Sequence, residues 1–231
     1  MGKIDSLDFK RNTLRNINNF LQNLNFKSNQ RNFTIKNPNG EHAICAGLKE
    51  EISVNIKGHV GYYCGGMNQK ANITIYGNAG TGVGENMMSG NIHVKGNVSQ
   101  SAGATAHGGT LLVDGNASSR CGISMKGADI IVKGSVGHMS GFMAQSGNLL
   151  ICGDAGEALG DSIYETVIYI AGSIRSLGVD CVEKKIKTSD IKKIETLLKK
   201  GNIKKFKPSN FKKFGSSRKL YNFNIDNVSE Y

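Results

Sequence analysis

The sequence predicts an all-β solenoid: a single-stranded right-handed parallel β-helix with 19-residue coils, flanked by short N- and C-terminal α-helices. The first observation is a glycine that recurs every 19 residues without an insertion, at Gly58, Gly77, Gly96, Gly115, Gly134, Gly153 and Gly172. The second is that the residues two and four positions before this glycine are always Val, Ile or Leu. The third is another glycine, seven positions after it, in the first six repeats. A fixed period of this length is typical of solenoids whose repeats stack on one another.

Each coil should bury one side of its strands. Alternate residues of a strand point to the same face, so the two aliphatic columns predict a core that continues from coil to coil. Small or apolar residues two and six positions after the repeat glycine should face the same core. We expect three short strands per coil, with the repeat glycines at corners between them.

The position that follows each repeat glycine predicts a polar ladder. Short side chains that tolerate corner conformations and bond to neighbouring backbone dominate it. These residues are His59, Asn78, Asn97, Asn116, Ser135, Asp154 and Ser173. We expect them to join each corner to the next.

The chain divides into a helical extension (1–32), the β-helix (33–182) and a basic helix with a tail (183–231). Apolar residues at helical spacing predict a helix between Asp8 and Leu24. A second helix is expected after Thr188 or Ser189 as its cap, ending at Gly201. Its apolar stripe would consist of Ile191, Ile194, Leu197 and Leu198.

One outward-facing column becomes apolar in the later coils. Three positions before the repeat glycine it is polar at Asn55, Thr74 and His93, and then becomes Leu112, Ile131, Leu150 and Tyr169. An exposed strip of large apolar side chains would be unfavourable. Either one of the chain's own terminal helices or another polypeptide should cover it, which makes these four residues a candidate interface.

The positive charge belongs to the C-terminal end. The net charge is +11, and residues 181–231 hold 14 Lys and Arg against 5 Asp and Glu. Such a tail can attract nucleic acid or an acidic partner, although a solvated end is the simpler interpretation and makes nucleic acid an improbable partner. Five cysteines without a C-x-x-C pair, and no signal peptide or membrane span, indicate a reduced, cytoplasmic protein.

The sequence predicts no catalytic, cofactor-binding or metal site in this chain. The five histidines lack metal-binding spacings. His138 and Glu157 occupy the same position in neighbouring coils and could form an acid–base pair, but a structural polar column is the favoured interpretation. Cys64 and Cys121 lie three coils apart, too far for a disulfide, and are expected in the core.

Several stretches resemble the GXGXG β-helix family. They include "GHVGYYCGGMN" (58–68), "GENMMSG" (84–90), "GDAGEALGDSIYE" (153–165) and "GSIRSLGVDCVEKK" (172–185), and the tail "FGSSRKLYNFNIDN" (214–227) fits as well. This domain type occurs at the C-terminus of the glutamate synthase large subunit and in one of the subunits of formylmethanofuran dehydrogenase. The sequence is most similar to the free-standing GXGXG subunit of N-methylglutamate synthase (methylamine–glutamate N-methyltransferase).

The resemblance implies a non-catalytic structural and docking subunit. An amidotransferase-like partner would hold one active site, and a glutamate-synthase-like partner would bind FMN, so no cofactor is expected on this chain. The alternatives within the family are a subunit of a glutamate synthase or of formylmethanofuran dehydrogenase. Outside it, the chain could be a stand-alone β-helical binding module, or an enzyme that uses His138 and Glu157.

Overall fold

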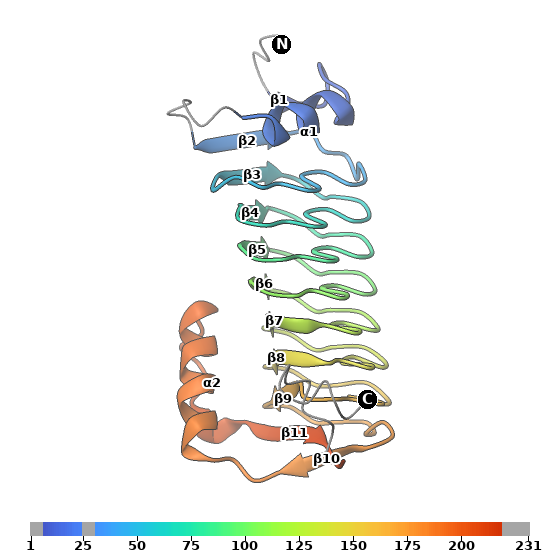
Figure 1. Cartoon of the computed structure of the whole chain (residues 1–231), viewed down its shortest axis with the longest axis vertical. Helices are drawn as coiled ribbons and strands as arrows, with labels where there is room; N and C mark the ends of the chain where they lie inside the picture. Colours follow the sequence, from blue (N-terminus) through green and yellow to red (C-terminus); the bar gives the residue numbers. More distant parts are fainter. Residues whose placement is uncertain (1–6, 25–30, 219–231) are drawn as a thin grey trace, which may run out of the picture.

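A single 11-stranded sheet runs along the whole solenoid (Figure 1). The computed structural model describes residues 7–24 and 31–218. The strands are β1 (Leu7–Asp8), β2 (Asn32–Lys36), β3 (Ser53–Lys57), β4 (Asn72–Ile75), β5 (Asn91–Val94), β6 (Thr110–Val113), β7 (Lys126–Val132), β8 (Ser146–Ile151), β9 (Val167–Ile170), β10 (Cys181–Lys184) and β11 (Lys212–Ser216). Pairing is parallel from β1 to β9, and opposing residues of β3 to β6 are 19 positions apart. The predicted parallel solenoid and its period are confirmed.

The core follows the columns that the repeat predicts. All seven residues two positions before the repeat glycine are fully buried, and those four positions before it are buried to the same degree. The residues two positions after the glycine form a second ladder of single parallel bridges, from Val60 through Ala117 to Ile174. The residues six positions after it, such as Cys64 and Leu159, are buried as well. The core is therefore one continuous apolar column.

The third side of each coil differs from the expectation of three short strands. Here alternate residues adopt left-handed backbone conformations, as at Arg120 (φ 57°), Gly122 (φ 71°) and Ser124 (φ 51°), and the neighbouring coils repeat this pattern. A strand needs negative φ throughout, so the backbone curls into turns instead. The turns bond to the coils on either side: Gly122 N donates to Ala102 O and Arg120 N to His138 O, both at 2.8 Å. Each coil thus holds one strand and one single-residue bridge.

The N-terminal helix closes one end of the core. Helix α1 (Leu14–Gln22) buries Ile17 and Leu21 against the first coils. Asn18 fixes its position, because its side-chain amide donates to Ala43 O at 2.8 Å and accepts from Cys45 N at 2.9 Å. The helix is shorter than the expected range because Leu7 and Asp8 form a strand beside β2. Leu7 and Asp8 of the N-terminal extension are therefore part of the common sheet.

The C-terminal segment turns back along the solenoid. Strand β11 pairs antiparallel with both β9 and β10, and a short 3-10 helix (Pro208–Asn210) precedes it. Helix α2 (Thr188–Lys200) lies beside the last coils (Figure 1). The expected helix is confirmed, but its N-cap is Lys187 rather than Thr188 or Ser189, and its buried face is not quite the predicted one. Ile191 is 41% exposed, and Asp190 is buried beside Ile194, Leu197 and Leu198.

Candidate functional site

The repeat glycines are points of close approach between one coil and the next. A Cβ atom on Gly77 would stand 2.6 Å from the carbonyl carbon of Gly58, and one on Gly153 would stand 2.7 Å from that of Gly134. Of the seven, only Gly58 adopts a positive φ that disfavours other residues. These glycines therefore serve the close approach of backbones rather than an unusual turn.

The polar ladder joins these corners as the sequence predicts. Asn97 N donates to Asn78 Oδ1, Asn116 N to Asn97 Oδ1 and Ser135 N to Asn116 Oδ1, each at 2.8 Å. The series begins at His59, whose ring nitrogen accepts from the backbone N–H of the next corner. It ends with Ser135 Oγ accepting from Asp154 N and Asp154 Oδ1 accepting from Ser173 N. Six consecutive inter-coil bonds thus use the side chains as acceptors for backbone N–H groups. The ladder stabilises the fold, and its side-chain acceptors are already engaged in inter-coil hydrogen bonds rather than open to a substrate.

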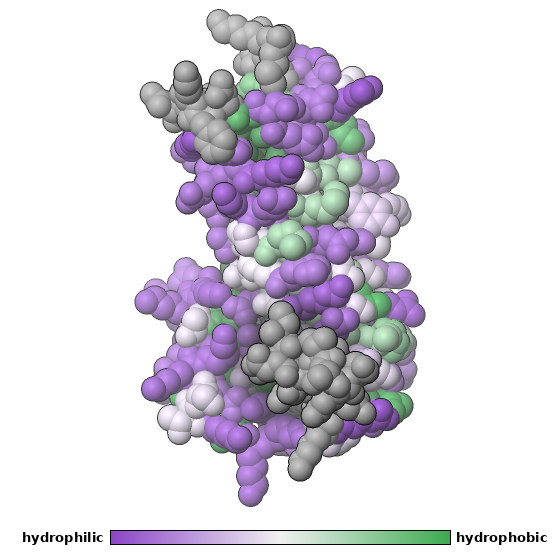
Figure 2. Space-filling view, viewed as in Figure 1, coloured by the Kyte–Doolittle hydropathy of each residue, from purple (hydrophilic) through white to green (hydrophobic). Residues whose placement is uncertain are grey.

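The apolar strip of the later coils is covered by the chain itself. Leu112, Ile131, Leu150 and Tyr169 are between 0% and 8% exposed and pack with Ile194, Leu197 and Leu198 of α2. The sequence left two possible covers for this strip, a terminal helix of the chain or another polypeptide. The chain's own helix α2 covers it, so the prediction that these four residues form an interface for a partner is wrong. The surface of the C-terminal segment turned toward the viewer is mainly hydrophilic (Figure 2).

A buried carboxylate anchors α2 to the sheet. Asp190 accepts hydrogen bonds from Tyr169 Oη (2.8 Å), Lys213 Nζ (2.8 Å) and Lys187 N (2.7 Å). Burial alone would raise its pKa, but the bonds from Lys213, the Lys187 amide and Tyr169 outweigh that effect and lower the pKa below its ordinary value. Burial and the same carboxylate raise the pKa of Tyr169. This cluster connects three segments of the chain.

The candidate acid–base pair is not brought together. Glu157 Oε1 forms an ion pair with Arg175 Nε at 3.1 Å, and His138 contributes its backbone carbonyl to an inter-coil bond. Both side chains are exposed. A general base needs hydrogen-bond contact with its reacting group in an ordered site. His138 and Glu157 are therefore two exposed members of a column of polar residues at the same position in successive coils.

A second polar cluster lies beyond the end of α2. Asp114 contacts His93 Nε2 at 2.9 Å, Lys133 Nζ at 2.8 Å and Lys95 Nζ at 3.5 Å. Desolvation raises the pKa of Asp114, but the bonds from Lys133 and His93 bring it below its ordinary value. A groove of about 300 Å³ beside it is lined by Thr74, His93 and Lys200, among others. The carboxylate is already neutralised by its cationic neighbours.

The five cysteines are unsuited to nucleophilic chemistry. All are buried, and desolvation raises the thiol pKa to about 12 at Cys64 and Cys121 and to about 11 at Cys152 and Cys181. A reactive cysteine needs a lowered pKa and solvent access. The expected core positions of Cys64 and Cys121 are confirmed.

Residues 7–24 and 31–218 lack the features of a metal site and of a membrane span. That part of the chain holds no group of three or more His, Cys, Asp or Glu side chains placed to bind a metal ion. Nor does it hold a helix with the length and apolar character that crossing a bilayer requires.

A known protein and a family pattern both match this chain over most of its length. The pattern of the GXGXG motif family matches residues 12–225. The chain belongs to the GXGXG motif family. Protein GlxC of Rhizobium meliloti (strain 1021) is 50% identical over 225 residues, which is 97% of this chain and 99% of that protein. This GXGXG chain and its relative therefore correspond almost end to end.

Sequence reasoning missed an aromatic cluster on the first coils of the GXGXG solenoid. The rings of His42 and Tyr62 stack with centroids 4.5 Å apart, and Tyr63 lies edge-on to Tyr62. Both tyrosines are about half exposed. Gly80 and Gly82 of the next coil leave space for them, since a Cβ atom there would stand within 2.9 Å and 2.6 Å of the Tyr62 and Tyr63 rings. The signal was the Tyr-Tyr pair one coil before two glycines.

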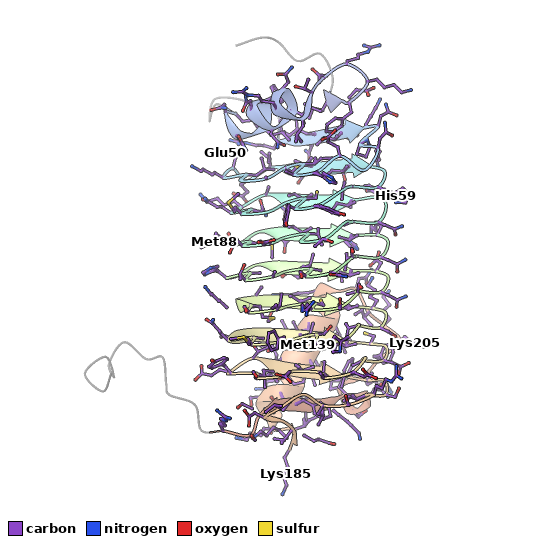
Figure 3. The ribbon with its side chains drawn as sticks, turned by 90° about the vertical axis from the view of Figure 1, so that its right-hand side faces the viewer. Glu50, His59, Met88, Met139, Lys185 and Lys205 are labelled. Atoms are coloured by element: carbon purple, nitrogen blue, oxygen red, sulfur yellow. The ribbon has the colours of Figure 1, made fainter. Side chains whose placement is uncertain are left out.

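A pocket of about 400 Å³ between the C-terminal strands and the last coil was also missed. It is lined by Thr166, Lys184, Lys185, Lys187, Lys213 and Arg218, among others, and is called the lysine pocket below. Lys185 projects from the C-terminal end of the solenoid (Figure 3). The sequence shows the lysines as a basic run, but their convergence depends on the antiparallel pairing of β10 and β11.

Proposed function

We propose that this chain is a non-catalytic structural subunit of a glutamate-synthase-like, FMN-containing complex of the N-methylglutamate synthase type. It would hold an amidotransferase-like subunit and an FMN-binding subunit in register, and the FMN would belong to the partner. The observation that carries the proposal is the end-to-end match with a free-standing GXGXG chain. The 50% identity with Protein GlxC over 97% of this chain supports the proposal.

The chemistry of the described residues supports a scaffold role. The polar corner residues bond to backbone of adjacent coils, the thiols are buried, and Glu157 is paired with an arginine rather than with His138. A rigid stack of coils also suits a subunit that keeps other chains at fixed separations.

The decisive experiment is a pull-down of the tagged chain from native extract, with mass spectrometry of the bound proteins and a visible absorbance scan. We expect an FMN protein and an amidotransferase-like chain to co-purify. The complex should then form N-methylglutamate from methylamine and glutamate. Formation of glutamate from glutamine and 2-oxoglutarate instead would favour the glutamate synthase alternative. A colourless single chain would refute the subunit proposal.

The non-catalytic role has its own test in the reconstituted complex. His138→Ala and Glu157→Gln should each leave turnover nearly unchanged, because neither side chain is proposed to touch substrate. A loss of roughly 100-fold with unchanged assembly and circular dichroism would instead identify a catalytic residue on this chain.

A further inference from the structure

We propose that the lysine pocket binds a multiply charged oxyanion, with a phosphate group as the chemical class that fits it. Five cationic side chains line it, and among the described residues its lining includes a single carboxylate, Glu165. The pocket is concave and of a size common to small-ligand sites. Lys187 and Lys213 also belong to the Asp190 cluster, but phosphate binding would not depend on partner subunits, so the proposal is independent of the scaffold role.

Only part of this positive charge is neutralised by the protein. Lys213 pairs with Asp190, and Arg218 pairs with Asp180, both at 2.8 Å. Within residues 7–24 and 31–218, Lys184, Lys185 and Lys187 have no ion-pair partner, and all three are exposed. The pocket therefore keeps an excess of positive charge close to its opening.

The strand register holds two of these cations side by side. Lys184 of β10 stands directly opposite Lys213 of β11. Like charges at opposing positions of an antiparallel pair are destabilising. Asp190 offsets Lys213, but Lys184 has no such partner in the described chain. An anion between the strands and the last coil would remove this repulsion.

A buried hydroxyl provides a second and independent indication. Thr166 lines the pocket and is 1% exposed. Its Oγ1 has no hydrogen-bond partner among the described residues. Leaving a buried polar group unpaired costs free energy, so such a group needs an explanation. A bound oxyanion would accept a hydrogen bond from this hydroxyl, and Ser216 also lines the pocket.

These features favour phosphate over a monocarboxylate. Three unpaired ammonium groups and hydroxyl donors from two segments offer more donors than one carboxylate can accept. A phosphate group has two negative charges near neutral pH and more acceptor oxygens, and charge-assisted bonds of this kind are the strong ones.

Titration calorimetry of the isolated full chain with inorganic phosphate, pyrophosphate and acetate tests the proposal. We expect one saturable site for phosphate or pyrophosphate that persists at physiological salt, with acetate at least about tenfold weaker. Lys184→Gln combined with Lys187→Gln should weaken phosphate binding about tenfold or more. The matched control is Lys192→Gln with Lys193→Gln, which removes two exposed lysines from α2 outside the pocket and should leave the affinity unchanged.

Thr166→Val separates a built site from diffuse attraction. It removes the unpaired hydroxyl while keeping the shape, so the free protein should be at least as stable as the original. Phosphate affinity should nevertheless fall several-fold. Unsaturable binding that physiological salt abolishes, or an equal loss in the α2 control, would overturn the proposal. So would binding that appears only after deletion of residues 219–231, because the pocket would then have an occupant from its own chain.

Discussion

Removing the Asp190 carboxylate should release α2 from the solenoid. Asp190→Ala removes the carboxylate that accepts hydrogen bonds from Tyr169 Oη and Lys213 Nζ. It also removes the capping bond that Lys187 N donates at the start of the helix. Tyr169 is 2% exposed and the Lys213 side chain 16%, so a buried hydroxyl and a partly buried ammonium group would both be left unpaired. Breaking a buried ion pair by removing one partner costs about 3–5 kcal/mol. The apolar contacts of Ile194, Leu197 and Leu198 remain.

Native-state hydrogen exchange resolves this local change. Because each 1.4 kcal/mol corresponds to a factor of ten, amide protection in α2 should fall roughly a hundredfold to several thousandfold. Protection in the central coils should change far less. Glu195→Ala is the matched control, since it removes an exposed carboxylate from the same helix. If Asp190→Ala lowers α2 protection no more than this control does, the anchoring role is refuted.

Acid should weaken the same anchor. The pKa of Asp190 in the folded chain lies below its ordinary value, so its contribution to stability is complete above about pH 4. It is lost as the pH falls through the lowered value. The protection of α2 should therefore decline in acid more steeply in the original chain than in Asp190→Asn, which has no proton to gain at this position. Parallel profiles would contradict the assignment.

Three further outcomes follow from the coils. Gly96→Ala should lower stability by about 1–3 kcal/mol in thermal unfolding, because its Cβ would stand 2.8 Å from Gly77 O; Gly215→Ala, whose Cβ would meet nothing closer than 3.8 Å, is the control. Asn116→Ala should lower the free energy of unfolding by about 1 kcal/mol, because Ser135 N loses its acceptor. Asn116→Asp keeps an acceptor oxygen and should retain most of that stability. Equal losses in the two variants would argue against the ladder. The five buried thiols should resist a disulfide reagent in the folded chain and react after denaturation, and rapid labelling without denaturant would be the contrary result.

The regular part of this fold is predictable because every coil repeats the same physical requirements. Buried aliphatic residues, close backbone contacts and side-chain acceptors recur at fixed positions, so seven copies reinforce each pattern. The turn-rich side of the coil was missed because left-handed residues there include Arg120, Met139 and Ala158, whose types do not announce that conformation. Contacts with adjacent coils, rather than local preference, hold them in place.

The C-terminal region was harder to predict because its contacts are made only once. Helical spacing predicts that Ile191 belongs to the buried apolar stripe of α2. Asp190 takes the buried position instead, because Tyr169 and Lys213 provide hydrogen-bond donors from other strands. The lysine pocket likewise depends on Lys184 standing opposite Lys213, a register between segments that the sequence pattern does not show. Helical spacing identifies a face only to within one residue when a buried polar partner competes for it.

The final bond of the corner ladder bears on polymerisation. Ser173 is its last member, and its hydroxyl donates back to Asp154 at 2.8 Å instead of accepting from a further coil. Immediately beyond, β11 runs against the direction of all preceding coils and occupies the edge of β9. A coil from a second molecule therefore cannot pair with β9, because β11 already occupies that edge and β10 forms the outer edge of the sheet. The open edge of a stack can act as a template for fibril growth, and β11 covers that edge of the last coil with a strand from the same molecule.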